Sequence, residues 1–153
     1  MPTEAGSHLQ KIICKAVSVA LLISGDMETA ENAVADAIQS LDAEDLSTDA
    51  LFLCVSTLSM QRTGNAGDRG AQSEECERFF ALPPELQNVL DLRRLPRCCF
   101  VLRFLLGLPV STCACLLQLE PHQVMDYCCA AVSLLGAISQ EKSATIAVGI
   151  CAR

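Results

Sequence analysis

The chain has 153 residues, of which 51% are hydrophobic and 19% charged, and its mean hydropathy is +0.35. This length allows one domain or two small helical ones. The apolar excess indicates either an unusually complete core or apolar surface that a partner or a second copy covers. The net charge of −7 disfavours proteins that hold nucleic acid through a strongly basic surface.

The charge is unevenly distributed along the chain. Residues 1–62 contain nine acids and three bases, residues 63–80 contain four and two, and residues 81–153 contain five and six. The uncharged stretch 104–119 includes Gly107 and Pro109 and is shorter than the roughly 20 apolar residues that span a membrane. The first residues lack the basic segment of a secretory signal. We therefore expect a cytoplasmic protein without a membrane span.

Apolar periodicity predicts three helices in the first 62 residues. The first covers about residues 8–24 and ends at Gly25, and Asp26 is a suitable N-cap for the second. The third begins at Thr48 and ends near Arg62. The residues expected on the inner faces of the second and third helices are Ala30, Val34, Ala37, Ile38, Leu41, Leu51, Val55 and Leu58.

Residues 63–77 contain three glycines and no apolar periodicity, which predicts a flexible linker. We therefore divide the chain into an N-terminal unit 1–62, a linker 63–80, a C-terminal helical unit 81–142 and a tail 143–153. The fold class expected for the whole chain is all-α.

Prolines punctuate the C-terminal unit at positions typical of helix starts. Pro83-Pro84 predicts a short helix to about Leu92. Pro96 predicts a helix that is broken at Gly107. Pro109 and Pro121 predict two further helices joined by residues 118–120, with the last one reaching about Gln140, and this layout is a helix-turn-helix. In the Pro96 helix, the side chains expected to point inward are Cys99, Leu102, Phe104 and Leu105.

Residues 95–135, LPRCCFVLRFLLGLPVSTCACLLQLEPHQVMDYCCAAVSLL, resemble the promoter-reading C-terminal domain of bacterial RNA polymerase sigma factors, in particular the extracytoplasmic-function type. The matching positions include Arg97, Arg103, Phe104 and Gly107. Others lie on the helix-turn-helix framework: Ala114, Leu117, Leu119, Val124, Ala131 and Leu134.

The N-terminal unit resembles the same family more weakly. Gly25-Asp26 followed by Ala30-Glu31 is similar to the family segment that contacts the polymerase clamp. The resemblance implies RNA polymerase core as a partner. The clamp-like contact residues that it implies are Glu31, Asn32, Ala35 and Asp36.

The resemblance places a recognition-helix face where this chain has no cation, since residues 104–141 contain neither Lys nor Arg. Cations supply most of the affinity for a DNA backbone. We therefore expect weak or no binding to promoter DNA, and a face that serves apolar docking or residual DNA contact. Its residues are Gln123, Met125, Asp126, Tyr127 and Ala130.

The cationic residues Arg93, Arg94, Arg97 and Arg103 form the remaining basic feature of this unit. They are candidates for a phosphate or partner contact. The alternatives are a solvated face or pairing with the acidic N-terminal unit. We favour these alternatives over a phosphate or partner contact because no further cations extend the patch.

The ten cysteines include no C-x-x-C pair, so we expect small buried side chains rather than a metal or cofactor site. His122 near Cys128 and Cys129 could form a nucleophile–base pair. No orienting acid accompanies them, so we expect no enzyme.

The sequence leaves three functions open. The first, which we favour, is a sigma-factor-like protein that acts in transcription through protein–protein contacts, with a regulator or a homo-oligomer as partner. The second is a working sigma factor that directs RNA polymerase to promoters. The third is a cysteine-based redox or metal sensor on the same fold.

Overall fold

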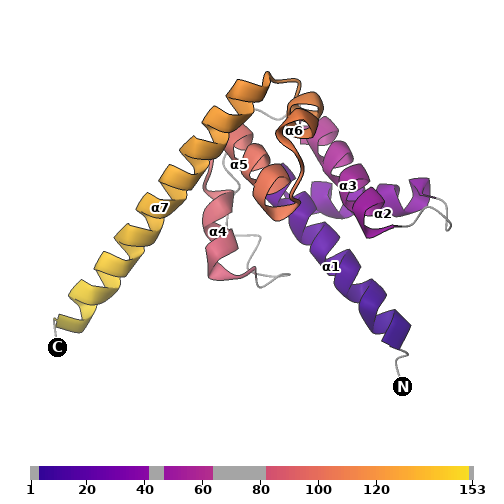
Figure 1. Ribbon diagram of the computed structural model, residues 1–153. Helices are drawn as coiled ribbons and strands as arrows, with labels where there is room; N and C mark the ends of the chain where they lie inside the picture. Colours follow the sequence, from indigo (N-terminus) through magenta and orange to yellow (C-terminus); the bar gives the residue numbers. More distant parts are fainter. Residues whose placement is uncertain (1–3, 42–46, 64–81, 152–153) are drawn as a thin grey trace.

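The computed structural model describes residues 4–41, 47–63 and 82–151, and every regular element in these ranges is helical (Figure 1). The all-α prediction is confirmed. The predicted linker 63–80 lies outside the described residues except for Thr63, which ends a helix. The elements are α1 Glu4–Ser24, α2 Met27–Ser40, α3 Thr48–Thr63, α4 Pro84–Leu90, α5 Arg94–Phe100, the π-helix η2 Val101–Leu105, α6 Val110–Leu117 and α7 Pro121–Cys151.

The junction between α1 and α2 is formed as the sequence predicts. Gly25 adopts a left-handed φ of 77°, which glycine takes without steric strain. Its N–H donates to the Leu21 carbonyl at 2.7 Å and closes the last turn of α1. Asp26 is the N-cap of α2, because its carboxylate accepts the Thr29 N–H at 2.8 Å. This junction turns the chain sharply, so that α2 packs back on α1.

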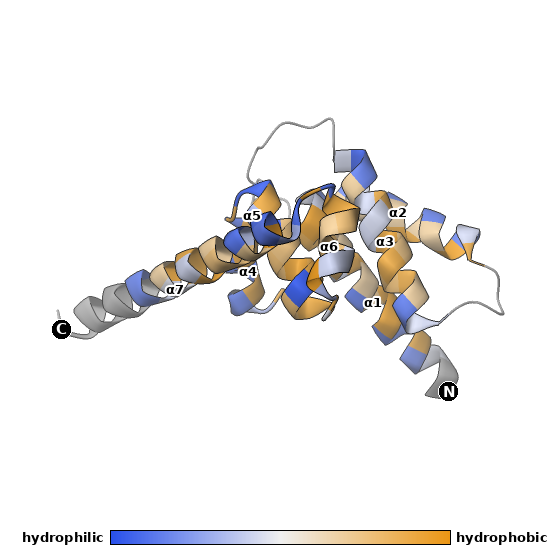
Figure 2. Ribbon diagram, turned by 45° about the horizontal axis from the view of Figure 1, so that its top comes forward, coloured by the Kyte–Doolittle hydropathy of each residue, from blue (hydrophilic) through white to orange (hydrophobic). Residues whose placement is uncertain are grey.

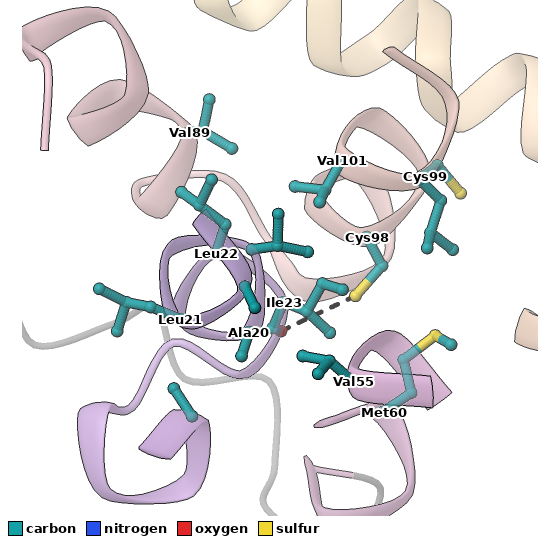
Figure 3. Close-up of a cluster of buried hydrophobic side chains, with 14 of the residues drawn as sticks. Ala20, Leu21, Leu22, Ile23, Val55, Met60, Val89, Cys98, Cys99 and Val101 are labelled. Atoms are coloured by element: carbon teal, nitrogen blue, oxygen red, sulfur yellow. Dashed lines mark hydrogen bonds between the residues drawn. The ribbon is translucent and has the colours of Figure 1, made fainter. Parts of the chain in front are cut away.

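Helix α1 occupies the centre of the molecule. It packs against α2 and α3 and also against α5 and η2, so residues from both halves of the chain share one hydrophobic cluster. Figure 3 shows this cluster around Leu21, Leu22 and Ile23, with Val55 of α3 and Val101 of η2 nearby. Full burial of one Leu or Ile side chain contributes about 1.5–3 kcal/mol. The two halves are therefore held together by apolar contact on α1.

The segment Gly6–Ser24 of α1 is long and apolar enough, by length and composition, to cross a membrane. The expectation of no membrane span was based on the stretch 104–119 and did not include this segment. A core helix of a soluble protein passes the same test, and α1 is buried inside the protein from Ala16 to Ser24 except at Ser18. Length and apolar composition alone are therefore weak evidence that this segment spans a membrane.

The largest departure from the predicted packing is at η2. The sequence places Phe104 and Leu105 inward, but their side chains are 54% and 41% exposed. The Leu106 N–H donates to the Val101 carbonyl at 3.0 Å, an i→i+5 bond that widens the turn. The wider turn rotates these two side chains away from the core, while Leu102 stays fully buried. The inward prediction is therefore wrong for both.

Two further expectations about the helices need correction. Ile38 is 38% exposed rather than inward, because Ala33, Val34 and Ala37 form the buried face of α2. Helix α7 does not end near residue 140 but continues to Cys151, so residues 143–151 of the proposed tail belong to it.

Candidate functional site

The connection from α6 to α7 is a short turn fixed by its own hydrogen bonds. Gln118 adopts a left-handed φ of 55°, and the Leu119 N–H donates to the Ala114 carbonyl at 2.9 Å. The Glu120 N–H donates to Oε1 of Gln123 at 3.0 Å, which is the return half of a capping box at the start of α7. The side chain of Gln123 is therefore engaged in the turn instead of projecting from the expected face.

Helix α7 has one covered side. Val124, Cys128 and Ala131 are buried at i, i+4 and i+7, and the helix packs on α4, α5 and α6 through this side. Tyr127 is half-buried and packs against the core, so its expected outward position is wrong. Asp126 and Ala130 are exposed, as expected for the recognition-helix face.

The exposed sides of α7 include large apolar side chains among polar ones such as Asp126. Met125, Val132 and Leu134 are 47%, 51% and 49% exposed, which is unusual for large apolar side chains on one helix. In Figure 1, α7 runs beyond the rest of the molecule, and Figure 2 shows hydrophobic residues interspersed with polar ones along its coloured part. The surface of α7 is therefore suited to contact with another protein.

Three of the four candidate arginines bind backbone carbonyls of this chain. Arg97 is 1% exposed, and its Nη1 donates to the carbonyls of Leu90 and Leu92 at 3.3 and 3.2 Å. Its Nη2 donates to the Ile23 carbonyl at 3.5 Å. Leu90 and Ile23 lie in the last turns of α4 and α1, whose carbonyls have no partner within their helices. The guanidinium thus joins the two halves of the chain.

Arg94 and Arg103 behave similarly. Arg94 donates to the Met60 carbonyl in the last turn of α3 at 3.4 Å, and Arg103 donates to the Leu108 carbonyl at 3.2 Å. Both side chains are half-buried, and only Arg93 of the four is exposed. The expectation of an outward phosphate or partner contact is therefore wrong for Arg97, which is enclosed by the core. The alternative that these arginines pair with acidic residues did not consider the backbone carbonyls at helix ends as their acceptors.

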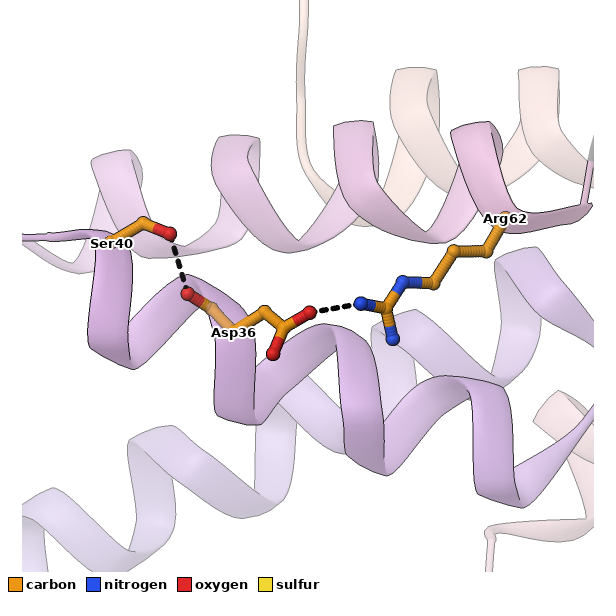
Figure 4. Close-up of polar contacts among 3 residues, drawn as sticks. All are labelled: Asp36, Ser40 and Arg62. Carbon is orange, nitrogen blue, oxygen red and sulfur yellow. Dashed lines mark hydrogen bonds and ion pairs between the residues drawn. The ribbon is translucent and has the colours of Figure 1, made fainter.

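The clamp-like residues lie on α2. Glu31, Asn32 and Ala35 are exposed and share its outer side, since residues four apart on a helix are neighbours. Asp36 lies at the edge of this side and forms an ion pair with Arg62 of α3 (Figure 4). The structure thus brings the first three together and directs the Asp36 carboxylate toward α3.

Four of the eight cysteines whose side chains the structure describes are buried. Cys98, Cys99, Cys113 and Cys128 are buried, whereas Cys115 and Cys129 are exposed. Burial raises the pKa of all four buried thiols, and the neighbouring thiols of Cys128, Cys98 and Cys113 add to this effect at Cys99, whose pKa rises from 9.0 to about 12. Thiols held in the protonated form are poor nucleophiles.

His122 and the neighbouring cysteines are not brought together. His122 is exposed and Cys128 is buried, so they do not face each other. Cys129 shares the side of His122, but seven residues of helix separate them by about 10 Å. In the described ranges, no group of three or more His, Cys, Asp or Glu residues has the arrangement of a metal site.

We expect the free energy of unfolding to fall as pH rises above 9. Folded Cys99 keeps its proton up to a pKa of about 12, whereas the unfolded thiol releases it near 9.0, so its contribution is complete below pH 9 and lost toward pH 12. Urea denaturation between pH 10 and 11 should give a slope that is smaller by about 1.2–1.4 kcal/mol per pH unit in Cys99→Ala. Cys115→Ala is the control, and an equal change of slope in both variants would contradict the assignment.

A cavity that the sequence did not reveal lies between α1, α3, α4 and η2, with a volume of about 560 Å³. Its lining includes Lys15, Asp49, Phe52 and Leu105. The volume is within the range of small-molecule sites. The two charged residues have opposite signs, so the lining selects neither an anion nor a cation. Segments distant in sequence meet here, which sequence periodicity cannot predict.

Comparison with protein-family models, with curated proteins and with solved structures gave no match to this chain.

Proposed function

We propose that this chain is a sigma-factor-like protein of the cytoplasm that acts in transcription initiation through protein–protein contacts, with weak or no DNA binding of its own. The observation that carries the proposal is the combination of an apolar exposed face on α7 with arginines that bind internal carbonyls. A DNA reader needs cations at its surface to neutralise phosphates. Here α6 and α7 are joined by a short turn, as the helix-turn-helix implied by the resemblance requires, but the exposed residues of α7 include the apolar Met125 and Val132 and no described cation.

The outer side of α2 supports the same proposal. Glu31, Asn32 and Ala35 form an exposed side, with one acidic and one amide side chain, that no other element of the described chain buries. Charged residues at the rim of an interface guide association more than they add affinity. The resemblance to the clamp-contacting segment of sigma factors favours RNA polymerase core as the partner of this side.

Capture on purified RNA polymerase core tests the proposal. We expect the native chain to be retained at moderate salt, and Glu31→Lys to weaken retention by about tenfold, because reversal of one rim charge changes binding by about 1.4 kcal/mol. Glu85→Lys on α4 is the matched control, since Glu85 is also an exposed glutamate but lies outside α2. Retention of neither native protein nor control would contradict the proposal.

The same experiment separates this proposal from a working sigma factor. We expect the complex of chain and core polymerase to retain no promoter DNA beyond that held by core polymerase alone. A salt-sensitive gel shift by the purified chain alone would contradict weak DNA binding. The redox-sensor alternative receives no support from the buried cysteines, because their raised pKa disfavours the reactive thiolate.

A further inference from the structure

The cavity between α1, α3, α4 and η2 combines an apolar interior with two charged residues in its lining. Val19, Leu22 and Leu82 contribute buried apolar side chains to this lining. The charged residues are Lys15 of α1 and Asp49 of α3, and both are exposed. The cavity is therefore apolar inside and polar where it meets the solvent.

The charges of Lys15 and Asp49 are available to a ligand. In the described ranges, neither side chain forms an ion pair or a hydrogen bond, either with the other or with a third residue. A few polar groups in a mostly apolar pocket fix the orientation of what binds there. The two residues thus offer one partner for an anionic group and one for a cationic group.

The two charges lie at the same end of the cavity. The carbonyls of Ile23 and Met60, in the last turns of α1 and α3, both accept hydrogen bonds from arginines of α5. Because one seven-residue helix reaches both carbonyls, α1 and α3 end close together and pack side by side in the same direction. Lys15 lies about 12 Å before Ile23 along α1, at a rise of about 1.5 Å per residue. Asp49 lies about 16 Å before Met60 along α3, so the two charges differ in level by less than one helical turn.

The lining becomes apolar beyond these charges. Lys15, Ser18, Val19 and Leu22 follow the spacing i, i+3, i+4 and i+7, so they lie on one side of α1. Leu22 is about 10 Å beyond Lys15 along the helix and is 1% exposed. A ligand that matches this lining carries both of its charges at one end and an apolar body at the other.

We propose that this cavity binds a free α-amino acid with a large apolar side chain. The carboxylate of the amino acid pairs with Lys15, and its ammonium group pairs with Asp49. Its side chain packs against Val19, Leu22 and Phe52. The volume of about 560 Å³ lies within the range of pockets for small molecules.

Related apolar molecules fit this lining less well. A fatty acid places its carboxylate near Asp49 as well as near Lys15, and an apolar amine likewise meets one like charge. A peptide carries its terminal charges at opposite ends, whereas the two protein charges lie at one end. In an α-amino acid both charged groups are attached to the same carbon, next to the apolar side chain.

An NMR titration of the isotope-labelled full chain with L-phenylalanine tests the inference. We expect saturable shifts of backbone amides between Lys15 and Leu22 and between Asp49 and Phe52. 3-Phenylpropanoate lacks the ammonium group and 2-phenylethylamine lacks the carboxylate. Each of these two analogues should bind about fivefold more weakly than L-phenylalanine, the effect of losing one exposed ion pair.

Charge-neutral variants give a crossed pattern that a merely structural role would not produce. Asp49→Asn should weaken the binding of L-phenylalanine about fivefold but not that of 3-phenylpropanoate, to which Asp49 offers only repulsion. Lys15→Gln should weaken L-phenylalanine about equally and leave 2-phenylethylamine unaffected. Lys11→Gln and Asp91→Asn are the controls, because both residues are exposed and lie outside the cavity lining. Circular dichroism establishes that each variant is folded.

Three results would overturn the inference. The first is no saturable binding of L-phenylalanine at millimolar concentration. The second is equal affinity for all three probes, which would mean that the cavity recognises only apolar surface. The third is tighter binding of either analogue than of L-phenylalanine, which would mean that the ligand carries a single charge. The cavity includes neither Glu31 nor any residue of α7, so these results are independent of capture by RNA polymerase core.

Discussion

Replacement of Arg97 by Ala should lower the free energy of unfolding by about 3–5 kcal/mol, since it removes hydrogen bonds from a charged donor and leaves a cavity. The guanidinium donates to the carbonyls of Leu90, Leu92 and Ile23. These carbonyls lie in a buried region, and each loses a charge-assisted hydrogen bond when the side chain is removed. The truncated side chain also leaves a cavity beside α1. Urea denaturation monitored by circular dichroism measures the effect.

Two further variants separate the contributions at this site. Arg97→Met fills most of the space but supplies no donor, so its loss of stability should lie between zero and that of Arg97→Ala. Arg93→Ala is the control, because Arg93 is exposed, and should change stability by less than about 0.5 kcal/mol. If Arg97→Ala is soluble but shows no cooperative unfolding transition, the variant is destabilised, as expected. Equal stability of Arg97→Ala and Arg93→Ala would contradict the internal role.

The role of Arg97 also illustrates what the sequence could not provide. The arginine residues were visible as a cationic cluster, but their partners are carbonyls at the ends of helices that are far away in sequence. Ile23 is 74 residues from Arg97. A helix pattern predicts where carbonyls lose their partners, but it does not predict which side chain of another helix reaches them.

Helix boundaries that local signals fix, and most inner-face residues of α2 and α3, could be predicted from the sequence. Gly25 and Asp26 predicted both the end of α1 and the cap of α2, because these residues act through local backbone geometry. Ala30, Val34 and Val55 are buried as the period of 3.6 residues requires. These features depend on interactions within a few residues.

The site was harder to predict because it depends on departures from regular geometry. The i→i+5 bond at η2 turned Phe104 and Leu105 outward, and the return of Gln123 to the Glu120 N–H removed a residue from the expected face. The absence of cations on α7 was apparent from the sequence. The exposure of Met125 and Val132 could not be predicted without knowing how α5 and α6 pack. These two helices cover only one side of α7.

Restoration of positive charge on α7 should give the protein measurable affinity for DNA. Met125, Asp126, Ala130 and Val132 are exposed, and the sigma-factor resemblance places basic or neutral polar residues there. The quadruple variant Met125→Lys, Asp126→Ser, Ala130→Arg and Val132→Arg removes one acid and adds three cations. Three phosphate contacts correspond to a slope of about −2.7 in a plot of log K against log salt. We expect a gel shift at 50 mM salt that is lost by 300 mM, and none for the native chain.

The control must carry the same change of charge elsewhere, because added charge alone attracts DNA at long range. Ile38→Lys, Gln39→Arg, Asp49→Ser and Leu53→Arg supply it on exposed positions of α2 and α3. If the α6–α7 layout presents α7 to a groove, the α7 variant should bind at least about tenfold more tightly than this control, a difference of about 1.4 kcal/mol. Equal binding by both variants would attribute the gain to net charge and contradict a helix-turn-helix origin of the face. A tighter α7 variant would instead mean that the fold still presents this helix to DNA and that the native side chains on it prevent binding.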